Sequence, residues 1–232
     1  MPQVIVTGQE FLTKILAGER DFSGIKLEER TILSVCPQFD QVVKYLREHP
    51  DKSSPIILSG AKLKYLQADE RLNLSYVVAE NTDFEGACLP NADLSYANLQ
   101  GACFADAVLT DADFRCANLQ GAKLSAAYLV EADLSEANLS RASLDHAILV
   151  GANLGEASLQ EADISGASLV GADLNEANLR KANLTSADLR AAENLDSVLN
   201  LTEAFFNRLV VTSKEKAYIE AVLSITPRYV LK

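Results

Sequence analysis

Two histidines and four cysteines are the side chains of this 232-residue chain that could most readily act as nucleophiles, general bases or metal ligands. His49 and His146 lie far apart, and neither has a nearby serine or cysteine arranged as a nucleophile with its base. The sequence also lacks a glycine-rich phosphate loop and a cluster of metal ligands. We therefore predict no catalytic residues, no cofactor and no metal, and we expect the chain not to be an enzyme.

The four cysteines are irregularly spaced, and no Cys-x-x-Cys pair indicates a zinc site. Cys88 and Cys103 each precede a large apolar residue of a repeated pattern, and Cys116 falls between two of its units. This placement favours isolated reduced thiols. A disulfide that involves Cys36 stays open as the alternative.

The pattern that must position these side chains is a five-residue repeat from Thr82 to Leu189, twenty-two units long, typified by Ala-Asp-Leu-Ser-Tyr. Each unit has a large apolar centre, which is Leu in eighteen units, and Ala stands two residues before the centre in every unit but the first. Two apolar residues separated by one position share a face of an extended strand, whereas a five-residue period fits neither a helix nor a continuous strand. Each unit is therefore predicted to be a short extended stretch followed by a two-residue corner. The predicted core includes the centres Leu89, Leu94, Leu99, Leu109, Leu129 and Leu149.

The number of units in one coil follows from the residue just before the centre. Asp occupies this position at twenty-residue spacing, in Asp93, Asp113, Asp133 and Asp173, with Asn153 between the last two. Asn recurs in the same way five residues later. Twenty residues are four units, so we predict a square tube whose coils stack at strand spacing, about 4.8 Å apart.

This repeat, Ala-(Asp/Asn)-Leu-x-x, resembles that of the pentapeptide-repeat proteins. The resemblance implies an all-β solenoid, a right-handed quadrilateral β-helix with the centre and the Ala pointing into the tube. Weaker units extend the pattern on the N-terminal side: Leu74 and Ala79 keep the register, Leu58 and Leu63 keep it after a one-residue slip, and Phe22, Leu27 and Ile32 resemble a first coil.

Non-repeating segments are predicted to form short α-helical caps at both ends and a helical insert. Thr7 and Glu10 form a capping-box pattern before an apolar helical spacing that ends at Gly18, and Thr212 and Glu215 repeat the pattern near the C-terminus. A short helix is also expected at 202–209. The predicted organisation is an N-terminal capping helix at 1–19, a first coil at 20–34, a helical insert at 35–55, the repeat β-helix at 56–191 and a C-terminal helical cap at 192–232.

One face of the predicted tube is unusually apolar. Large residues that should point outward stack at twenty-residue spacing in two neighbouring columns, and we name this set the apolar stripe: Val108, Tyr128 and Ile148, with Thr110, Val130, Val150 and Val170. An exposed apolar patch of this kind marks an interface with a protein partner or a second copy of the chain. Two alternatives stay open: these residues simply favour extended backbone, or the helical insert covers them.

The next face is acidic, and we name its residues the acidic face: Asp93, Asp113, Asp133, Asp173, Glu136, Glu156 and Glu176. Phosphates recur about every 3.4 Å along a DNA strand, so regular carboxylate columns could imitate that surface. The resemblance supports this reading, since some pentapeptide-repeat proteins, including quinolone-resistance proteins, bind DNA gyrase as mimics of duplex DNA. The alternative is that these Asp side chains bond the nearby backbone at each corner.

Charge and hydropathy restrict the partners further. The net charge is −11, and the segment from Thr82 to Ala191 alone carries sixteen acidic and six basic residues. This balance disfavours direct nucleic-acid binding, which needs clustered Lys and Arg. No run approaches the roughly 18 apolar residues of a membrane helix, and the N-terminal residues lack the features of a signal peptide. We therefore expect no membrane association and a cytoplasmic location. The sequence favours a rigid scaffold that binds proteins, with a mimic of DNA that binds a type II topoisomerase as the alternative.

Overall fold

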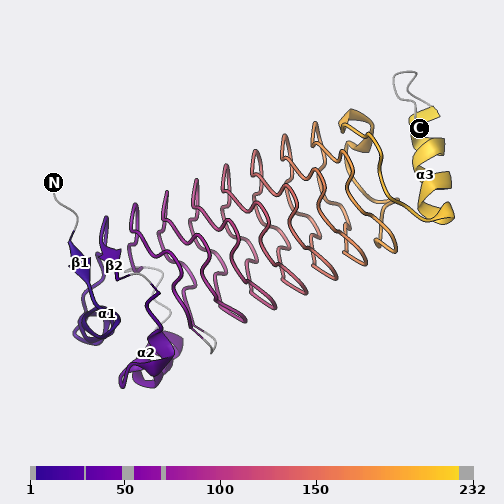
Figure 1. The fold of residues 1–232 in the computed structure, drawn as a ribbon. Coiled ribbons are helices and arrows are strands. Elements are labelled where there is room, and N and C mark those ends of the chain that lie inside the picture. The colour runs from indigo at the N-terminus through magenta and orange to yellow at the C-terminus, as the bar shows by residue number, and fades with distance from the viewer. Residues whose placement is uncertain (1–3, 29, 49–54, 69–71, 225–232) are drawn as a thin grey trace.

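The computed structural model is an elongated tube of stacked coils with helices at both ends (Figure 1). It describes residues 4–28, 30–48, 55–68 and 72–224. Its regular elements are β1 (Ile5–Val6), α1 (Gly8–Leu16), β2 (Lys26–Leu27), the 3-10 helix η1 (Leu33–Val35), α2 (Phe39–Glu48), the 3-10 helix η2 (Leu201–Glu203) and α3 (Ser213–Ser224). The coils between η1 and η2 form through single-residue parallel bridges rather than long strands.

The residue before each centre forms the bridge between coils. Val108 pairs in parallel with Tyr128, and Tyr128 pairs with Ile148, so residues twenty apart lie on successive rungs. The N–H of Tyr128 donates to Ala107 one coil back at 2.8 Å, and its carbonyl accepts from Leu109 at 2.8 Å. The N–H of the neighbouring Leu129 donates to Ile148 one coil ahead at 2.8 Å, so the coils on either side satisfy the backbone polar groups of each short stretch.

Each corner is a tight turn with one residue in the left-handed region. In the unit centred on Leu94, the N–H of Ala97 donates to the carbonyl of Leu94 at 3.2 Å, and Tyr96 has φ +58°. A positive φ at the third turn position is the signature of a type II turn, which glycine adopts without strain. Gly101 and Gly121 occupy such corners, but many others hold Glu, Asp or Lys.

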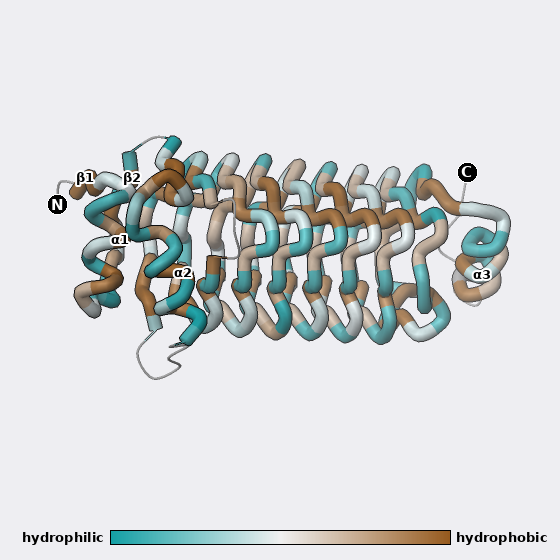
Figure 2. The backbone as a smooth tube through the Cα atoms, turned by 90° about the horizontal axis from the view of Figure 1, so that it is seen from below, coloured by the Kyte–Doolittle hydropathy of each residue, from teal (hydrophilic) through white to brown (hydrophobic). Residues whose placement is uncertain are grey.

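The core is a continuous stack of apolar side chains inside the tube. The centres predicted from the sequence are at most 1% exposed, namely Leu89, Leu94, Leu99, Leu109, Leu129 and Leu149. Phe84 and Phe104 stack with ring centroids 4.8 Å apart where a centre is aromatic. Figure 2 shows hydrophobic segments of successive coils lying in lines along the tube. The interior is therefore filled by side chains.

The N-terminal end is closed by α1 and by one extra strand. Thr7 caps α1, with the Glu10 N–H donating to the Thr7 hydroxyl at 3.1 Å and the Thr7 N–H donating to Glu10 at 2.9 Å, which confirms the predicted capping box. No strand was predicted before this helix, but β1 pairs in parallel with β2. Phe11 of α1 packs edge-on against Phe22 of the first coil, with centroids 4.9 Å apart.

The first coil corrects one sequence assignment. Ile32 was expected to be a centre that points inward, but it bridges to Gln67 and is 37% exposed. The adjacent Leu33 is fully buried in its place. The spacing from the centre Leu27 to Leu33 is six residues rather than five, so the chain gains one residue in this stretch.

The insert forms α2 beside the first coil. Its apolar side, Phe39, Val42, Val43 and Leu46, is buried, and the helix contacts α1 and η1. Tyr45 is hydrogen-bonded to Arg20, whose guanidinium carbon lies 5.3 Å from the centre of the tyrosine ring. Residues 49–54, which include His49 of the predicted insert, lie outside the described residues.

The coil winding continues beyond the last regular unit. The repeat was predicted to end at residue 191, yet Leu199, Phe205 and Val210 form parallel bridges with the coil before them. The expected helix at 202–209 is replaced by η2 because the chain returns to bridging conformation at Phe205. Beyond this last coil, α3 begins with the N–H of Thr212 donating to Glu215 at 2.7 Å.

Candidate interaction surface

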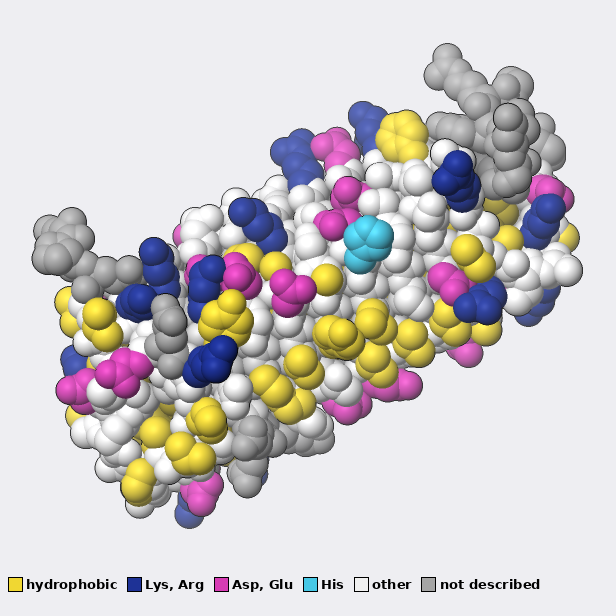
Figure 3. Space-filling model, viewed as in Figure 1, with side chains coloured by type: hydrophobic (Ala, Val, Ile, Leu, Met, Phe, Trp, Pro, Cys, Tyr) yellow, Lys and Arg dark blue, Asp and Glu magenta, His cyan; other side chains and the backbone are white. Residues whose placement is uncertain are grey.

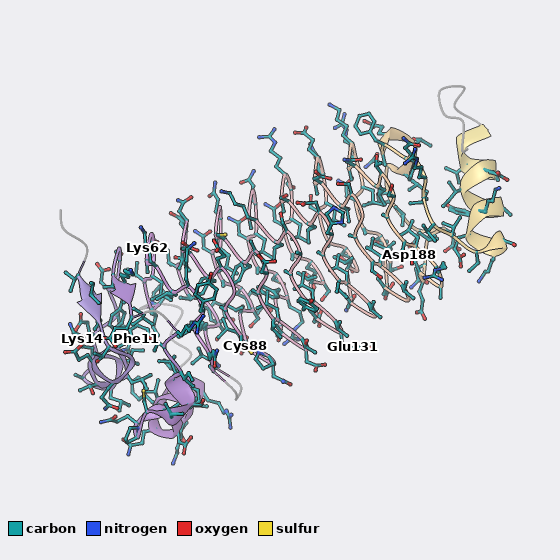
Figure 4. The ribbon with its side chains drawn as sticks, in the orientation of Figure 1. Phe11, Lys14, Lys62, Cys88, Glu131 and Asp188 are labelled. Carbon is teal, nitrogen blue, oxygen red and sulfur yellow. The ribbon has the colours of Figure 1, made fainter. Side chains whose placement is uncertain are left out.

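The apolar stripe is one continuous exposed surface. Val108, Tyr128 and Ile148 occupy consecutive rungs of a ladder that runs from Ile32 to Val210 and includes Cys88 before the stripe and Asp188 after it. Tyr128 is 47% exposed, and the other members are partly exposed. Figure 3 shows a band of hydrophobic side chains running along the tube, and Figure 4 labels Cys88 and Asp188 near its two ends. The stripe spans several coils rather than a single rung.

Helix α2 does not turn its apolar side toward this stripe. That side is buried, and the helix packs on α1 and η1 at the N-terminal end. In Figure 1, α2 lies beside the first coils, whereas the coils that carry the stripe occupy the middle of the tube. In the part of the chain that the structure describes, the stripe therefore stays partly exposed in the presence of α2.

The corners beside the stripe are acidic. Asp106 lies on one side, and Asp111 and Glu131 lie on the other; all three are exposed. The ion pairs recorded for the described residues include none of these three carboxylates. Figure 3 shows acidic side chains along the lower edge of the hydrophobic band. No role was predicted for Asp106, although the repeat places it one unit before Asp111.

The acidic face is built differently. Its Asp side chains accept hydrogen bonds from the backbone N–H two residues later: Ser95 to Asp93 at 3.1 Å, Ser135 to Asp133 at 3.0 Å and Asn175 to Asp173 at 2.9 Å. Such Asx turns fix the direction in which the chain enters each corner. These carboxylates therefore have a structural role, and they are partly buried rather than fully presented to solvent.

A cation interrupts the acidic face. Arg115 donates to both carboxylate oxygens of Asp113, at 2.6 to 3.0 Å, and lies 3.7 Å from Asp133. Burial alone would raise the pKa of Asp113, but the hydrogen bonds from Arg115 outweigh it and hold that pKa below its usual value. Two of the four Asp carboxylates in the column thus share one guanidinium.

The corner column of the acidic face starts with aromatic rings and ends with carboxylates. Tyr76 and Tyr96 stack with centroids 5.0 Å apart, Cys116 follows, and its thiol donates to Glu136 at 3.6 Å. Burial and the nearby Glu136 carboxylate raise the pKa of Cys116. Glu136, Glu156 and Glu176 themselves are exposed. The column therefore changes from apolar to acidic along the tube.

The remaining reactive groups do not form a catalytic arrangement in the part of the chain that the structure describes. All four cysteines are free, so no disulfide involves Cys36. The one group of three potential metal ligands found there is Asp83, Glu85 and Cys103. The ammonium of Lys64 lies 2.6 Å from Glu85 and 3.6 Å from Asp83, and the hydrogen bond to Glu85 raises the pKa of Lys64. This arrangement is that of a surface ion pair.

His146 and the cleft beside α3 lie apart from each other. His146 is exposed at a corner, where its ring covers Gly166 of the next coil. A cleft of about 740 Å³ lies at the other end of the chain, between the last coil and α3, and Glu193, Lys214 and Tyr218 contribute to its lining. Within the described ranges, none of the helices has both the length and the apolar character that a membrane span requires.

Comparison with known proteins agrees with the ladder of coils. The similar solved structures include full-length QnrB1, described as a plasmid-mediated fluoroquinolone resistance protein (16% identity, 95% of this chain and 97% of that chain, TM-score 0.57), and a trypsin-treated variant of QnrB1 (19% identity, 96% of this chain and 97% of that chain, TM-score 0.53). At these identities the similarity shows the fold alone. No curated protein matches the sequence.

A family model described as pentapeptide repeats matches in eight copies, over residues 73–111, 92–129, 117–155 and 157–192, which together make up just over half of the chain. The family and the similar structures imply a right-handed quadrilateral β-helix, with four bridged sides in each coil. The chain belongs to the pentapeptide repeat family.

Proposed function

We propose that this protein is a non-catalytic, rigid interaction module that binds a protein partner through the apolar stripe. The observation that carries the proposal is the column of apolar side chains on rungs 108, 128 and 148, of which Tyr128 is exposed and Val108 and Ile148 are partly exposed, on a tube whose other sides carry mainly polar residues. Exposed apolar patches that span several elements more often mark interfaces than occur by chance.

Rigidity follows from how the coils are joined. Each rung is hydrogen-bonded to the rung before and the rung after it, and the interior is filled by buried Leu, Ala and Phe side chains. A surface on such a frame keeps its shape without a partner, which lowers the entropy lost when a partner binds. The stripe is therefore pre-organised for binding.

The test is a double variant, Tyr128→Ser with Ile148→Ser, beside a matched control, Gln100→Ser with Gln120→Ser, which changes the opposite side of the tube. We expect the stripe variant to keep its thermal stability and to lose any self-association or co-purifying partner of the wild type. The measurements are mass in solution, thermal unfolding and pull-down. Retention of the same partners and mass by a stably folded stripe variant would falsify the proposal.

A second candidate function is binding to a type II topoisomerase as a mimic of DNA. The observation that favours it is the match in fold to a fluoroquinolone resistance protein over nearly the full length of both chains, together with the net charge of −11. A gyrase supercoiling assay separates the candidates. Dose-dependent inhibition, or protection from a quinolone, supports the mimic of DNA. If neither effect is seen, the interaction module is the candidate function that remains.

A further inference from the structure

The charges beside the apolar stripe indicate what kind of partner it fits. We propose, resting on the function proposed above, that the stripe binds an amphipathic helix of another protein whose apolar side is flanked by Lys and Arg.

Carboxylates without a paired cation border the stripe. Asp106, Asp111 and Glu131 border the stripe on both sides, are exposed, and take part in no ion pair recorded for the described residues. By contrast, Arg115 on the next face is already bound to Asp113. Among the described residues, Lys62 and Lys123 are exposed on the ladder of the preceding face, and Lys62 lies three coils before Lys123. Arg190, which follows Val170 by one coil, is already paired with Asp188. The three carboxylates therefore outnumber Lys123 beside the stripe. A partner with basic flanks would neutralise these edges.

The same charges oppose a second copy of the chain as the occupant. Two copies packed stripe to stripe would each bring a net charge of −11 and would place unpaired acidic edges against one another. Juxtaposed like charges suppress association, whereas complementary charges speed encounter and select partners. A basic partner removes this repulsion.

The length of the stripe matches a short helix. Thr110 and Val170 are three rungs apart, which is roughly 14 Å at strand spacing. An α-helix rises 1.5 Å per residue, so about ten residues, close to three turns, cover that distance. Apolar residues at i, i+3 or i+4, and i+7 of such a helix would meet successive rungs. The two-column width suits a single helical face.

One edge of the stripe is also open at its C-terminal half. Gly151 and Gly171 follow Val150 and Val170 at the corners where Asp111 and Glu131 stand earlier. At Gly171, the position that a Cβ would occupy has no other atom within 4 Å. The Glu131 carboxylate leans over Gly151. The edge therefore changes from acidic to open, which lets a helix approach the apolar columns closely while its basic residues reach the acidic half.

The test measures binding of fluorescent stapled helical peptides of about 14 residues to the full chain. One peptide has Leu at i, i+3, i+4 and i+7 with Lys flanks, a second replaces Lys with Glu, and a third is the Lys peptide with its order scrambled. We expect the Lys peptide to bind at least about tenfold more tightly than either of the others. Fluorescence anisotropy at about 0.05 M and 0.5 M salt measures the electrostatic part, because screening shortens the reach of exposed charges.

Two variants assign the site. Tyr128→Ser with Ile148→Ser is expected to weaken the Lys peptide about tenfold. Asp111→Asn with Glu131→Gln is expected to weaken it and to reduce its salt dependence, whereas the control Glu156→Gln with Glu176→Gln, which removes the same charge from the acidic face, has a smaller effect. Circular dichroism confirms that each variant keeps its fold.

The outcomes separate this inference from the proposed function. If the Glu peptide binds as well as the Lys peptide, or if the wild type dimerises and the stripe variant does not, the stripe is an interface but the basic helix is wrong. If no peptide binds, the proposal of a helical partner with basic flanks is also overturned. If the Lys peptide binds the stripe variant as tightly as the wild type, the attraction is general to an acidic protein, and the stripe is not its site.

Discussion

The guanidinium of Arg115 lies 2.6 Å from a carboxylate oxygen of Asp113 and 3.7 Å from Asp133 on the next coil. Under the topoisomerase alternative, this cation interrupts the column that would imitate phosphates. We then expect Arg115→Gln to inhibit supercoiling at lower protein concentration than the wild type. Arg141→Gln, which breaks a pair with Glu161 elsewhere on the tube, is the control. Equal inhibition by all three proteins would show that the acidic face is not the contact.

The central leucines should dominate stability. Leu129 is fully buried between coils that are bonded on both sides, so the cavity left by Leu129→Ala has little room to close. We expect the free energy of unfolding to fall by about 2 to 5 kcal/mol. Urea denaturation followed by circular dichroism measures the change. The partly exposed neighbour in Val130→Ala should cost much less, and equal losses in the two variants would contradict the inward assignment of Leu129.

Corners with a positive φ should prefer glycine. Ala126 stands at such a corner with φ +55°, whereas Ala105, at the other position of a corner on the same side, has no positive φ. We expect Ala126→Gly to raise the free energy of unfolding, because an L-residue is strained there by about 1 kcal/mol or more. Ala105→Gly should lower it by roughly 0.5 to 1 kcal/mol. Thermal unfolding of the pair is the measurement, and the same sign in both would be the contrary result.

The Cys116 thiol should become more reactive when its acidic neighbour is neutralised. Burial raises the pKa of Cys116, and the Glu136 carboxylate raises it further by disfavouring the thiolate. In Glu136→Gln, we expect the pKa to fall and alkylation of Cys116 near neutral pH to become faster, because the thiolate is the reacting form. Site-resolved mass spectrometry across a pH series follows the rate. Glu156→Gln, one coil further along, should leave the rate unchanged.

Asp145 should contribute a stability that depends on pH. Its carboxylate accepts hydrogen bonds from the hydroxyls of Ser125 and Ser143, both at 2.6 Å, and these bonds hold the pKa of Asp145 below its usual value. A carboxyl with a lowered folded-state pKa stabilises the fold above its unfolded-state pKa, about 3.9, and the effect is lost as the pH falls through the folded-state pKa. Ser125→Ala should therefore be less stable than the wild type at pH 7.

That difference should shrink as the pH falls below about 4, because the unfolded carboxyl is then protonated before the folded one and protons favour the unfolded chain. Urea denaturation at pH 7 and at pH 3 gives the comparison. The control is Ser165→Ala. Ser165 stands in the same corner column, one coil after Asp145. A stability loss in Ser125→Ala that is the same at both pH values would mean that the hydroxyl does not act through the charge of Asp145.

The regular part of this fold could be predicted from the sequence because each unit repeats the same local physics. Two apolar positions in five, with an Asp or Asn at the bridge, determine both the inward columns and the stacking of residues twenty apart. The placement of Val108, Tyr128 and Ile148 on one ladder follows directly. Even the α2 residues Phe39 and Leu46 followed from helical spacing, because an amphipathic pattern is local.

The departures from regularity could not be predicted in the same way. Whether Ile32 or Leu33 points inward depends on where one extra residue is absorbed, and both are large and apolar. The bridges at Phe205 and Val210 follow coils of unequal length, so no fixed period reveals them. The contact of Arg115 with two carboxylates depends on a side-chain conformation. These features arise from tertiary packing rather than from the repeat.

The bridge spacing of twenty residues makes the length of this tube adjustable in whole coils only. Duplicating twenty residues within the ladder would add one rung to every side and leave each column in line. Duplicating five would instead turn everything beyond it by a quarter of a circle, so that Ile148 would continue the column of a neighbouring side and the stripe would be cut. Insertions and deletions in this chain are thus constrained by the rotation that they impose on later coils as well as by composition. A five-residue insertion would also be a way to move part of the apolar stripe to a neighbouring side deliberately.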